Sequence, residues 1–335
     1  MKDRLHYIDV MKGITMLVVV LHHVLWITVD LKNVTNSTML FLHEWQDMLA
    51  SFIMPAFFFC TGYCSSFNKA FKPFFISNFK SLLVPSITVG IAYEIIYGRF
   101  LQLPSTLNMA MHKGFLFFWF LYALFYGKMI FWILNKIVKK AWIIITILLI
   151  FAFVATLCND INFLGWNFMQ YRQTLNLTLY LGIGYYFKKF PYQNRMLKVG
   201  ALLFVAGVAL SRIIPFVIPR VTAGFNCTLT QEPLHIFYAL TGTLLVMWIS
   251  KKIDKNLCLE EIGKKSLIIY VIHNTIILHS TDWIFRDMLQ KTNSILFVLL
   301  IVVVMVALAT AISYMICVAL NTKYLKWTLG KILIE

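Results

Sequence analysis

About ten apolar segments, each roughly 20 residues long, dominate this sequence, and a helix of that length crosses a lipid bilayer. They cover residues 8–28, 47–67, 76–97, 115–135, 141–158, 172–188, 196–217, 233–250, 266–284 and 294–319. Only 13% of the 335 residues are charged, about half the share of a soluble domain. Lipid cannot satisfy exposed backbone groups, so spanning segments of this kind fold as helices. We therefore expect an all-α integral membrane protein with about ten transmembrane helices, forming a single domain over residues 1–335.

The basic residues predict the orientation of the chain in the membrane. Most lysines and arginines flank the two termini and the even-numbered connections between predicted helices, among them Lys69, Lys72, Lys251 and Lys252. Such residues collect on the cytoplasmic side, which places both termini in the cytoplasm and the protein in the inner (cytoplasmic) membrane. Topology and contact with anionic lipids account for most of the net charge of +16. We expect no nucleic-acid partner.

The first apolar segment carries three ionisable residues, Asp9, Lys12 and His23, although such groups at membrane depth are costly and usually functional. A helix turns about 100° per residue, so the eleven steps from Lys12 to His23 end roughly 20° past three turns. Asp9 lies on the same stripe, whereas His22 points about 100° away. Lys12 and His23 are roughly 16 Å apart along the helix. We expect chemistry on this stripe, with Lys12 near the cytoplasmic face and His23 in the outer half of the bilayer.

His23 and Lys12 each have two interpretations. A histidine with a pKa near neutrality takes a proton from a hydroxyl and returns it to a leaving group, but histidines also form hydrogen bonds between membrane helices. Lys12 either binds a phosphate as a point charge or anchors the helix at the lipid headgroups. Lys80, at the cytoplasmic start of the third segment, has the same two interpretations. The stripe favours a functional role for His23 and leaves the two lysines open.

Other polar residues lie in or beside later segments. His273 follows Tyr270 by three residues in the ninth segment, so both lie on one helix face. His273 is the second candidate for a catalytic histidine, and a hydrogen bond between helices explains it equally well. Polar residues near the outer helix ends are either sugar-binding or ordinary interfacial residues: Glu94, Arg172, Arg212, Glu232, His235, His279 and Asp282. The sequence contains no metal-binding His-Glu-x-x-His motif and no glycine-rich phosphate loop.

Six short motifs, in order along nearly the whole chain, resemble those of the acyltransferase-3 family of ten-span membrane acyltransferases. The opening motif combines Arg4, Asp9 and Lys12-Gly13 with a histidine eleven residues after the lysine, which selects His23 over His22. The other five are Met54-Pro55 followed by aromatics and Gly62-Tyr63, Lys80 with Pro85, Trp119-Phe-Leu121, Gly182-Ile-Gly184-Tyr185-Tyr186, and Gly263…Ser266-Leu267…Tyr270…His273. Two positions depart from the family pattern: Lys12 replaces the arginine of many members, and Ser81 stands where a second basic residue is common.

The resemblance implies transfer of an acyl group, usually acetyl from acetyl-CoA, onto a hydroxyl of a cell-surface glycan or its lipid-linked precursor. It assigns the essential histidine to His23 and its basic partner to Lys12. A basic inner rim of Lys12, Lys80 and Lys72 would suit the phosphates of the acyl-CoA. This donor is a substrate, and we expect no tightly bound cofactor and no metal.

Two questions about mechanism and function stay open at this stage. We expect His23 to act as a general base for direct attack of the sugar hydroxyl on the thioester, and an acyl-His23 intermediate is the rival. The alternative function is transport or flipping of a lipid-linked saccharide without chemistry, because ten spans and buried polar groups also suit a transporter.

Overall fold

The computed structural model describes residues 5–31, 37–96, 118–160, 170–213, 228–274, 278–292, 294–322 and 324–330, and no strand occurs in these ranges. The α-helices are α1 His6–Leu31, α2 Ser37–Cys64, α3 Phe71–Asn78, α4 Val84–Ile96, α6 Trp119–Ile137, α7 Ala141–Asp160, α8 Tyr171–Phe187, α9 Gln193–Ile213, α10 Glu232–Ile253, α11 Leu257–Ile272, α12 Leu278–Lys291 and α13 Ile295–Leu320. A π-helical turn, Phe79–Leu83, joins α3 to α4, and a 3₁₀ turn covers Lys326–Leu329. The expected all-α fold is confirmed.

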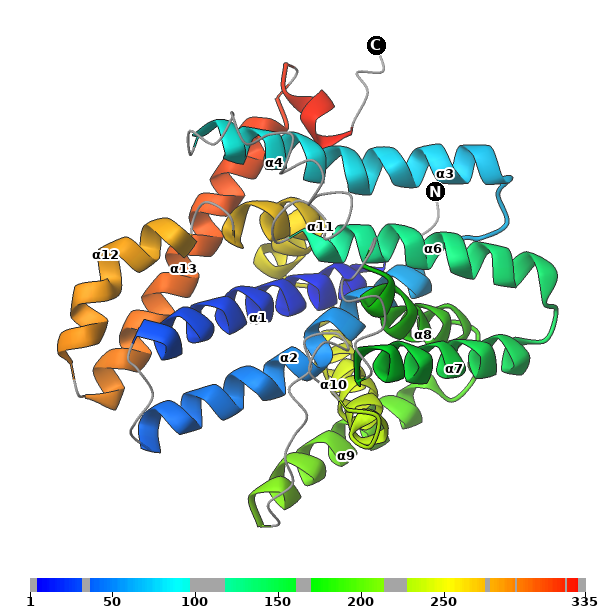
Figure 1. Cartoon of the computed structure of the whole chain (residues 1–335), viewed down its shortest axis with the longest axis horizontal. Helices are drawn as coiled ribbons and strands as arrows, with labels where there is room; N and C mark the ends of the chain where they lie inside the picture. The colour runs from blue at the N-terminus through cyan, green and yellow to red at the C-terminus, as the bar shows by residue number, and fades with distance from the viewer. Residues whose placement is uncertain are drawn as a thin grey trace.

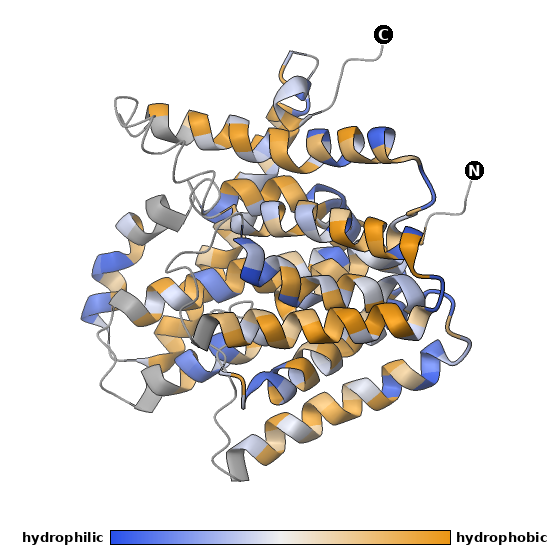
Figure 2. Ribbon diagram, turned by 45° about the vertical axis from the view of Figure 1, so that its right-hand side comes forward, coloured by the Kyte–Doolittle hydropathy of each residue, from blue (hydrophilic) through white to orange (hydrophobic). Residues whose placement is uncertain are grey.

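Helix α1 lies in the interior of the bundle (Figure 1) and packs against α2, α10, α11 and α13. On the other side of α2, helix α8 packs against α2, α6 and α7. Apolar residues run along most of the helix length (Figure 2), as expected for helices that face either lipid or one another. Two cavities described below lie beside α1, where helices that are distant in sequence meet.

Helices α1 and α11 cross at two glycines, one on each helix. A Cβ atom built on Gly13 would overlap the carbonyl oxygen of Leu259, and one built on Gly263 would overlap the carbonyl oxygen of Asp9. Only glycine allows this backbone approach, which is a common way for membrane helices to pack. The contact positions α11 alongside the stripe of α1 that carries Lys12 and His23.

Eight helical stretches within the described ranges are long and apolar enough to cross a membrane, and they match eight of the predicted segments. The sixth predicted segment, 172–188, corresponds to α8, a 17-residue helix that buries Arg172, Gln173, Thr174 and Asn176. Its low apolar content reflects polar side chains that face the protein interior instead of lipid. The ninth predicted segment, 266–284, is divided between α11 and α12. The total of ten spans and the cytoplasmic termini stay predictions.

Candidate active site

Two histidines from distant parts of the chain meet in the interior. Nε2 of His273, at the end of α11, lies 3.3 Å from Nδ1 of His23 on α1, and the ring centroids are 5.1 Å apart. His273 is completely buried, whereas His23 is half-buried. The two catalytic candidates from the sequence are therefore neighbours, although they are 250 residues apart in the chain.

The hydrogen-bond partners of this pair determine where its protons sit. Nδ1 of His23 lies 2.9 Å from the carbonyl oxygen of Val19, and Nδ1 of His273 lies 2.9 Å from that of Ile269. A carbonyl oxygen only accepts, so in the neutral state each Nδ1 carries the proton; this tautomer is assigned from the network. His23 then also directs its Nδ1–H toward the lone pair on Nε2 of His273. Within the described residues Nε2 of His23 has no hydrogen-bond partner, and it keeps the lone pair that a general base needs.

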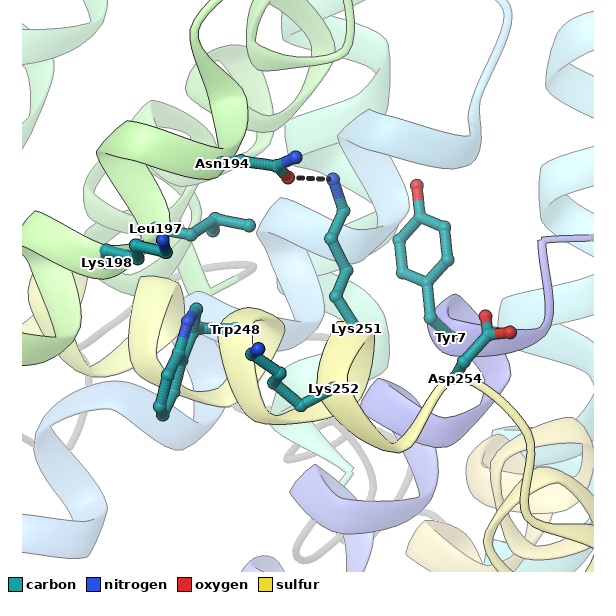
Figure 3. Close-up of a pocket in the computed structure, with 8 residues that line it drawn as sticks. All are labelled: Tyr7, Asn194, Leu197, Lys198, Trp248, Lys251, Lys252 and Asp254. Carbon is teal, nitrogen blue, oxygen red and sulfur yellow. Dashed lines mark hydrogen bonds between the residues drawn. The ribbon is translucent and has the colours of Figure 1, made fainter.

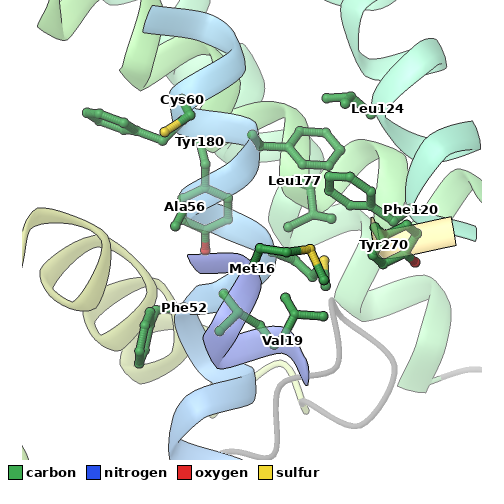
Figure 4. Close-up of a cluster of buried hydrophobic side chains, with 14 of the residues drawn as sticks. Met16, Val19, Phe52, Ala56, Cys60, Phe120, Leu124, Leu177, Tyr180 and Tyr270 are labelled. Atoms are coloured by element: carbon green, nitrogen blue, oxygen red, sulfur yellow. The ribbon is translucent and has the colours of Figure 1, made fainter. Parts of the chain in front are cut away.

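A cavity of about 370 Å³ lies beside the N-terminal part of α1 and extends as far as Tyr270 of α11. Tyr270 joins the cavity to the histidine pair, because it lines the cavity and its ring centroid is 5.9 Å from that of His273. Phe120 packs against Tyr270 with a centroid distance of 5.1 Å. Figure 4 shows Phe120 and Tyr270 together with Met16 and Val19 of α1, which belong to the same buried apolar cluster. The cavity is thus apolar at the end that approaches the histidines.

The other end of the cavity is basic. Lys12, Lys128 and Lys264 all line it. The Lys12 ammonium lies 3.6 Å from Asp9, and that of Lys264 lies 2.8 Å from Glu261. Hydrogen bonds from Lys264 and the following lysine lower the pKa of Glu261 to about 2. Among the described residues, no carboxylate lies within 4.0 Å of the Lys128 ammonium. An uncompensated positive charge therefore faces the cavity.

Lys128 is the site residue that the sequence analysis missed. It lies inside the fourth predicted segment, and a lysine within an apolar span carries the same signal of function as Lys12 does. Lys80 and Lys72, which were expected at a basic rim with Lys12, do not line this cavity, although Leu82 does. Lys72 is exposed and Lys80 is half-buried, and their role in donor binding stays a prediction.

A second polar group lies between α7, α8 and α10. The Glu232 carboxylate accepts hydrogen bonds from Thr156 Oγ1 at 2.7 Å and from Asn176 Nδ2 at 2.8 Å. Nδ1 of His235 is 3.4 Å from the same carboxylate. All four side chains are completely buried, and Arg172 lies one helical turn before Asn176 on α8. Arg172, Glu232 and His235, three of the seven candidate sugar-binding residues, thus occur in one region. The side chains of the other four lie outside the described residues: Glu94, Arg212, His279 and Asp282.

Several buried polar atoms around α8 and α10 have no hydrogen-bond partner among the residues that the structure describes. They are Nε2 of His235, Oδ1 of Asn176, and the hydroxyl oxygens of Thr174 and Thr243. Buried polar atoms are normally satisfied, and each such exception calls for an explanation.

The neighbour of His23 in sequence, His22, has a different partner. Nδ1 of His22 lies 3.2 Å from the backbone oxygen of Gln46 on α2. His22 therefore faces α2, while His23 faces His273.

Comparison with known proteins places the chain in a family. The model of the acyltransferase domain called acyltransferase-3 matches residues 5–314, nearly the whole chain. The comparison with curated proteins and the comparison with solved structures each found no match. The matched range includes both histidines and all three lysines of the cavity. The protein is a multi-pass membrane protein of apolar helices, and it belongs to the acyltransferase-3 family.

Proposed function

We propose that this acyltransferase moves an acyl group, most simply acetyl, from acyl-CoA onto a hydroxyl of a cell-surface glycan or a lipid-linked saccharide at the cytoplasmic membrane. One observation carries the proposal: a cavity with a basic end has at its apolar end Tyr270, whose ring lies 5.9 Å from that of His273, and His273 in turn contacts His23 at 3.3 Å. A general base at the end of a donor-binding cavity is the arrangement that acyl transfer to a hydroxyl requires.

The donor would enter from the side of Lys12. Coenzyme A is anionic, and a lysine binds phosphate as a compact point charge. Lys12 and Lys128 supply two such charges, of which Lys128 has no carboxylate within 4.0 Å among the described residues. The cavity volume of about 370 Å³ lies within the range of ligand pockets. A thin pantetheine arm then follows the apolar wall past Phe120 toward Tyr270 and the histidines.

The proposed reaction is a direct transfer. Nε2 of His23 takes the proton of the acceptor hydroxyl, whose oxygen forms a bond to the thioester carbon while the carbon–sulfur bond breaks. The departing thiolate then receives that proton from the His23 imidazolium and leaves as CoA-SH. Nε2 of His273 accepts a hydrogen bond from Nδ1–H of His23 at 3.3 Å, which orients the ring and stabilises the imidazolium. His273 is therefore a positioning residue in this mechanism.

The acceptor would use the polar group around Glu232. Sugars present many hydroxyls. The side-chain atoms of His235, Asn176 and Thr174 that have no partner among the described residues are matching donors and acceptors. Arg172, which is also buried, adds a positive charge in the same part of α8. Glu94 remains a proposed member of this group on the basis of its sequence position alone.

Adjacent histidines provide a matched test. In cells that lack the wild-type protein, His23→Ala should abolish the acyl mass shift of the surface glycans, because loss of a general base slows a reaction by about 10²–10⁴. His22→Ala should retain the shift, because His22 faces α2. Both variants are checked for equal amounts in the membrane and equal thermal stability. Unchanged glycan acylation in His23→Ala would remove the base assignment and favour the transporter alternative.

The role of His273 and the covalent rival need separate measurements. His273→Ala should lower kcat and shift the pH profile, whereas His273→Gln should recover part of the rate because its amide oxygen can accept from Nδ1–H of His23. Equal rates in the two variants would contradict the positioning role. For the rival, radiolabelled acyl-CoA is added to purified protein without acceptor. Label retained on wild type and absent from His23→Ala would replace direct transfer by an acyl-His23 intermediate.

A further inference from the structure

A second cavity, of about 520 Å³, opens between α1, α9 and α10 (Figure 3). Tyr7 of α1 lines it, together with Leu197 and Lys198 of α9 and Trp248 of α10. On a helix turning about 100° per residue, Tyr7 points roughly 140° away from Lys12. None of the residues that line this second cavity also lines the cavity at Lys12, here called the donor cavity. The two cavities therefore lie on different sides of α1.

The walls of this second cavity are strongly basic. Lys198, Lys251 and Lys252 line it against a single carboxylate, Asp254. Within the described ranges, none of these lysines forms an ion pair at 4.0 Å or less. Three like charges that share a cavity with one carboxylate repel one another, and a bound anion would relieve that repulsion.

Neutral groups hold Lys251 in position. Its ammonium donates to Oε1 of Gln193 and Oδ1 of Asn194, each at 3.3 Å, and lies 5.3 Å from the ring centroid of Tyr7. Figure 3 shows the Lys251 side chain between Asn194 and Tyr7. These contacts orient the ammonium group and contribute no counter-charge, so the ammonium is held at a defined place in the cavity.

Trp248 adds an unused donor to the same wall. Its Nε1 atom is buried and has no hydrogen-bond partner in the described part of the chain. An indole N–H can only donate, and a buried donor without an acceptor is unfavourable. An anionic oxygen would satisfy this N–H together with the lysines.

The exposed apolar residues of α9 that follow Lys198 indicate where such an anion could come from. Leu202 follows Lys198 by one helical turn and is 70% exposed, and Val205 is 59% exposed. In a membrane protein this apolar face contacts lipid. A phosphate at Lys198 could therefore belong to a phospholipid whose acyl chain runs along α9.

We propose that the cavity between α1, α9 and α10 binds a phosphate ester, with the headgroup of an anionic phospholipid as the source that the α9 surface favours. The phosphate would contact Lys198, Lys251 and Nε1–H of Trp248. A soluble phosphate ester has the same chemistry and is the other source. The proposal does not depend on acyl transfer, because none of these residues lies in the donor cavity.

The test measures lipid binding to the purified full-length chain by native mass spectrometry. Phosphatidylglycerol should bind wild type more tightly than zwitterionic phosphatidylcholine. The double variant Lys198→Gln/Lys251→Gln should weaken phosphatidylglycerol binding about 30-fold, since one lysine near a phosphate contributes about fivefold. The control Lys139→Gln/Lys140→Gln removes the same charge from the connection between α6 and α7, and it should leave phosphatidylglycerol binding unchanged. Equal affinities for the two lipids, or equal losses in both double variants, would overturn the site.

Two further arms complete this experiment. Trp248→Phe keeps a ring but loses the N–H, and it should weaken phosphatidylglycerol binding severalfold without changing thermal stability. This variant tests the site even if the lysine double variant fails to fold, and wild-type affinity in Trp248→Phe would remove the indole contact. Added glycerol phosphate distinguishes the sources: displacement of the lipid at millimolar concentration indicates a site open to soluble phosphate esters, and resistance indicates the lipid.

Discussion

The crossing of α1 and α11 predicts that Gly263→Ala disables the histidine pair from a distance. A Cβ atom on Gly263 would lie 2.8 Å from the carbonyl carbon of Asp9, whereas non-bonded carbons rest at about 3.5–4.0 Å. The two helices must therefore move apart by about 1 Å at this point. Both closest atoms belong to backbone, so no side chain can turn away to relieve the overlap.

The displacement reaches the chemistry because α11 is rigid. His273 lies ten residues beyond Gly263, about 15 Å along the helix. A shift of about 1 Å lengthens the 3.3 Å contact between His273 and His23 to roughly 4.3 Å, beyond hydrogen-bond range. Overpacking of this kind destabilises a protein by about 1–3 kcal/mol, and a 1 Å misplacement lowers a catalytic rate by about 10²-fold.

The assay compares acyl transfer to the glycan fraction with thermal unfolding of the same preparations. Gly207→Ala is the matched control, since the three atoms nearest to its Cβ belong to the side chains of Phe237 and Tyr238 and lie 3.0 Å or more away. Both variants gain the same helix propensity, so the difference between them isolates the helix crossing. Wild-type rate and wild-type stability in Gly263→Ala would refute the reasoning from backbone contact to catalytic geometry.

Three further variants test other parts of the molecule. Lys128→Met should raise KM for acyl-CoA about fivefold, which corresponds to about 1 kcal/mol, with little change in kcat. The reason is that it removes a contact made equally in the ground state and the transition state. An unchanged KM would exclude Lys128 from the donor site. Glu232→Gln places an amide group where Asn176 donates, and the unfolding temperature should fall in line with a loss of about 1–3 kcal/mol; equal stability would contradict the network. Gly330→Ala should loosen the C-terminal turn, because Gly330 has φ +66° and its Cβ would overlap the carbonyl of Lys80. Limited proteolysis after residue 320 should then be faster than in wild type, and an unchanged cleavage rate would contradict the role of Gly330.

Local patterns in the sequence predicted much of the molecule. The apolar segments identified the helices because length and composition alone decide whether a segment can cross a bilayer. The eleven-residue spacing distinguished His23 from His22, and the structure places His22 against α2. The family also followed from short motifs in the correct order, and the family model confirms it over residues 5–314.

Long-range contacts supplied the rest. Helical periodicity relates residues only within one helix, so it could not show that His273 meets His23, that Lys128 faces the same cavity as Lys12, or that Tyr7 helps form a second cavity. It also gave the segment 266–284 as one helix, whereas the structure divides this segment between α11 and α12, and α12 is an amphipathic helix with charged residues among its apolar ones. The sequence by itself determined which segments are helical and which residues are costly in a membrane. Only the packing of α1 against its neighbours decided which of those residues share a cavity, because that depends on backbone approaches such as the one at Gly263.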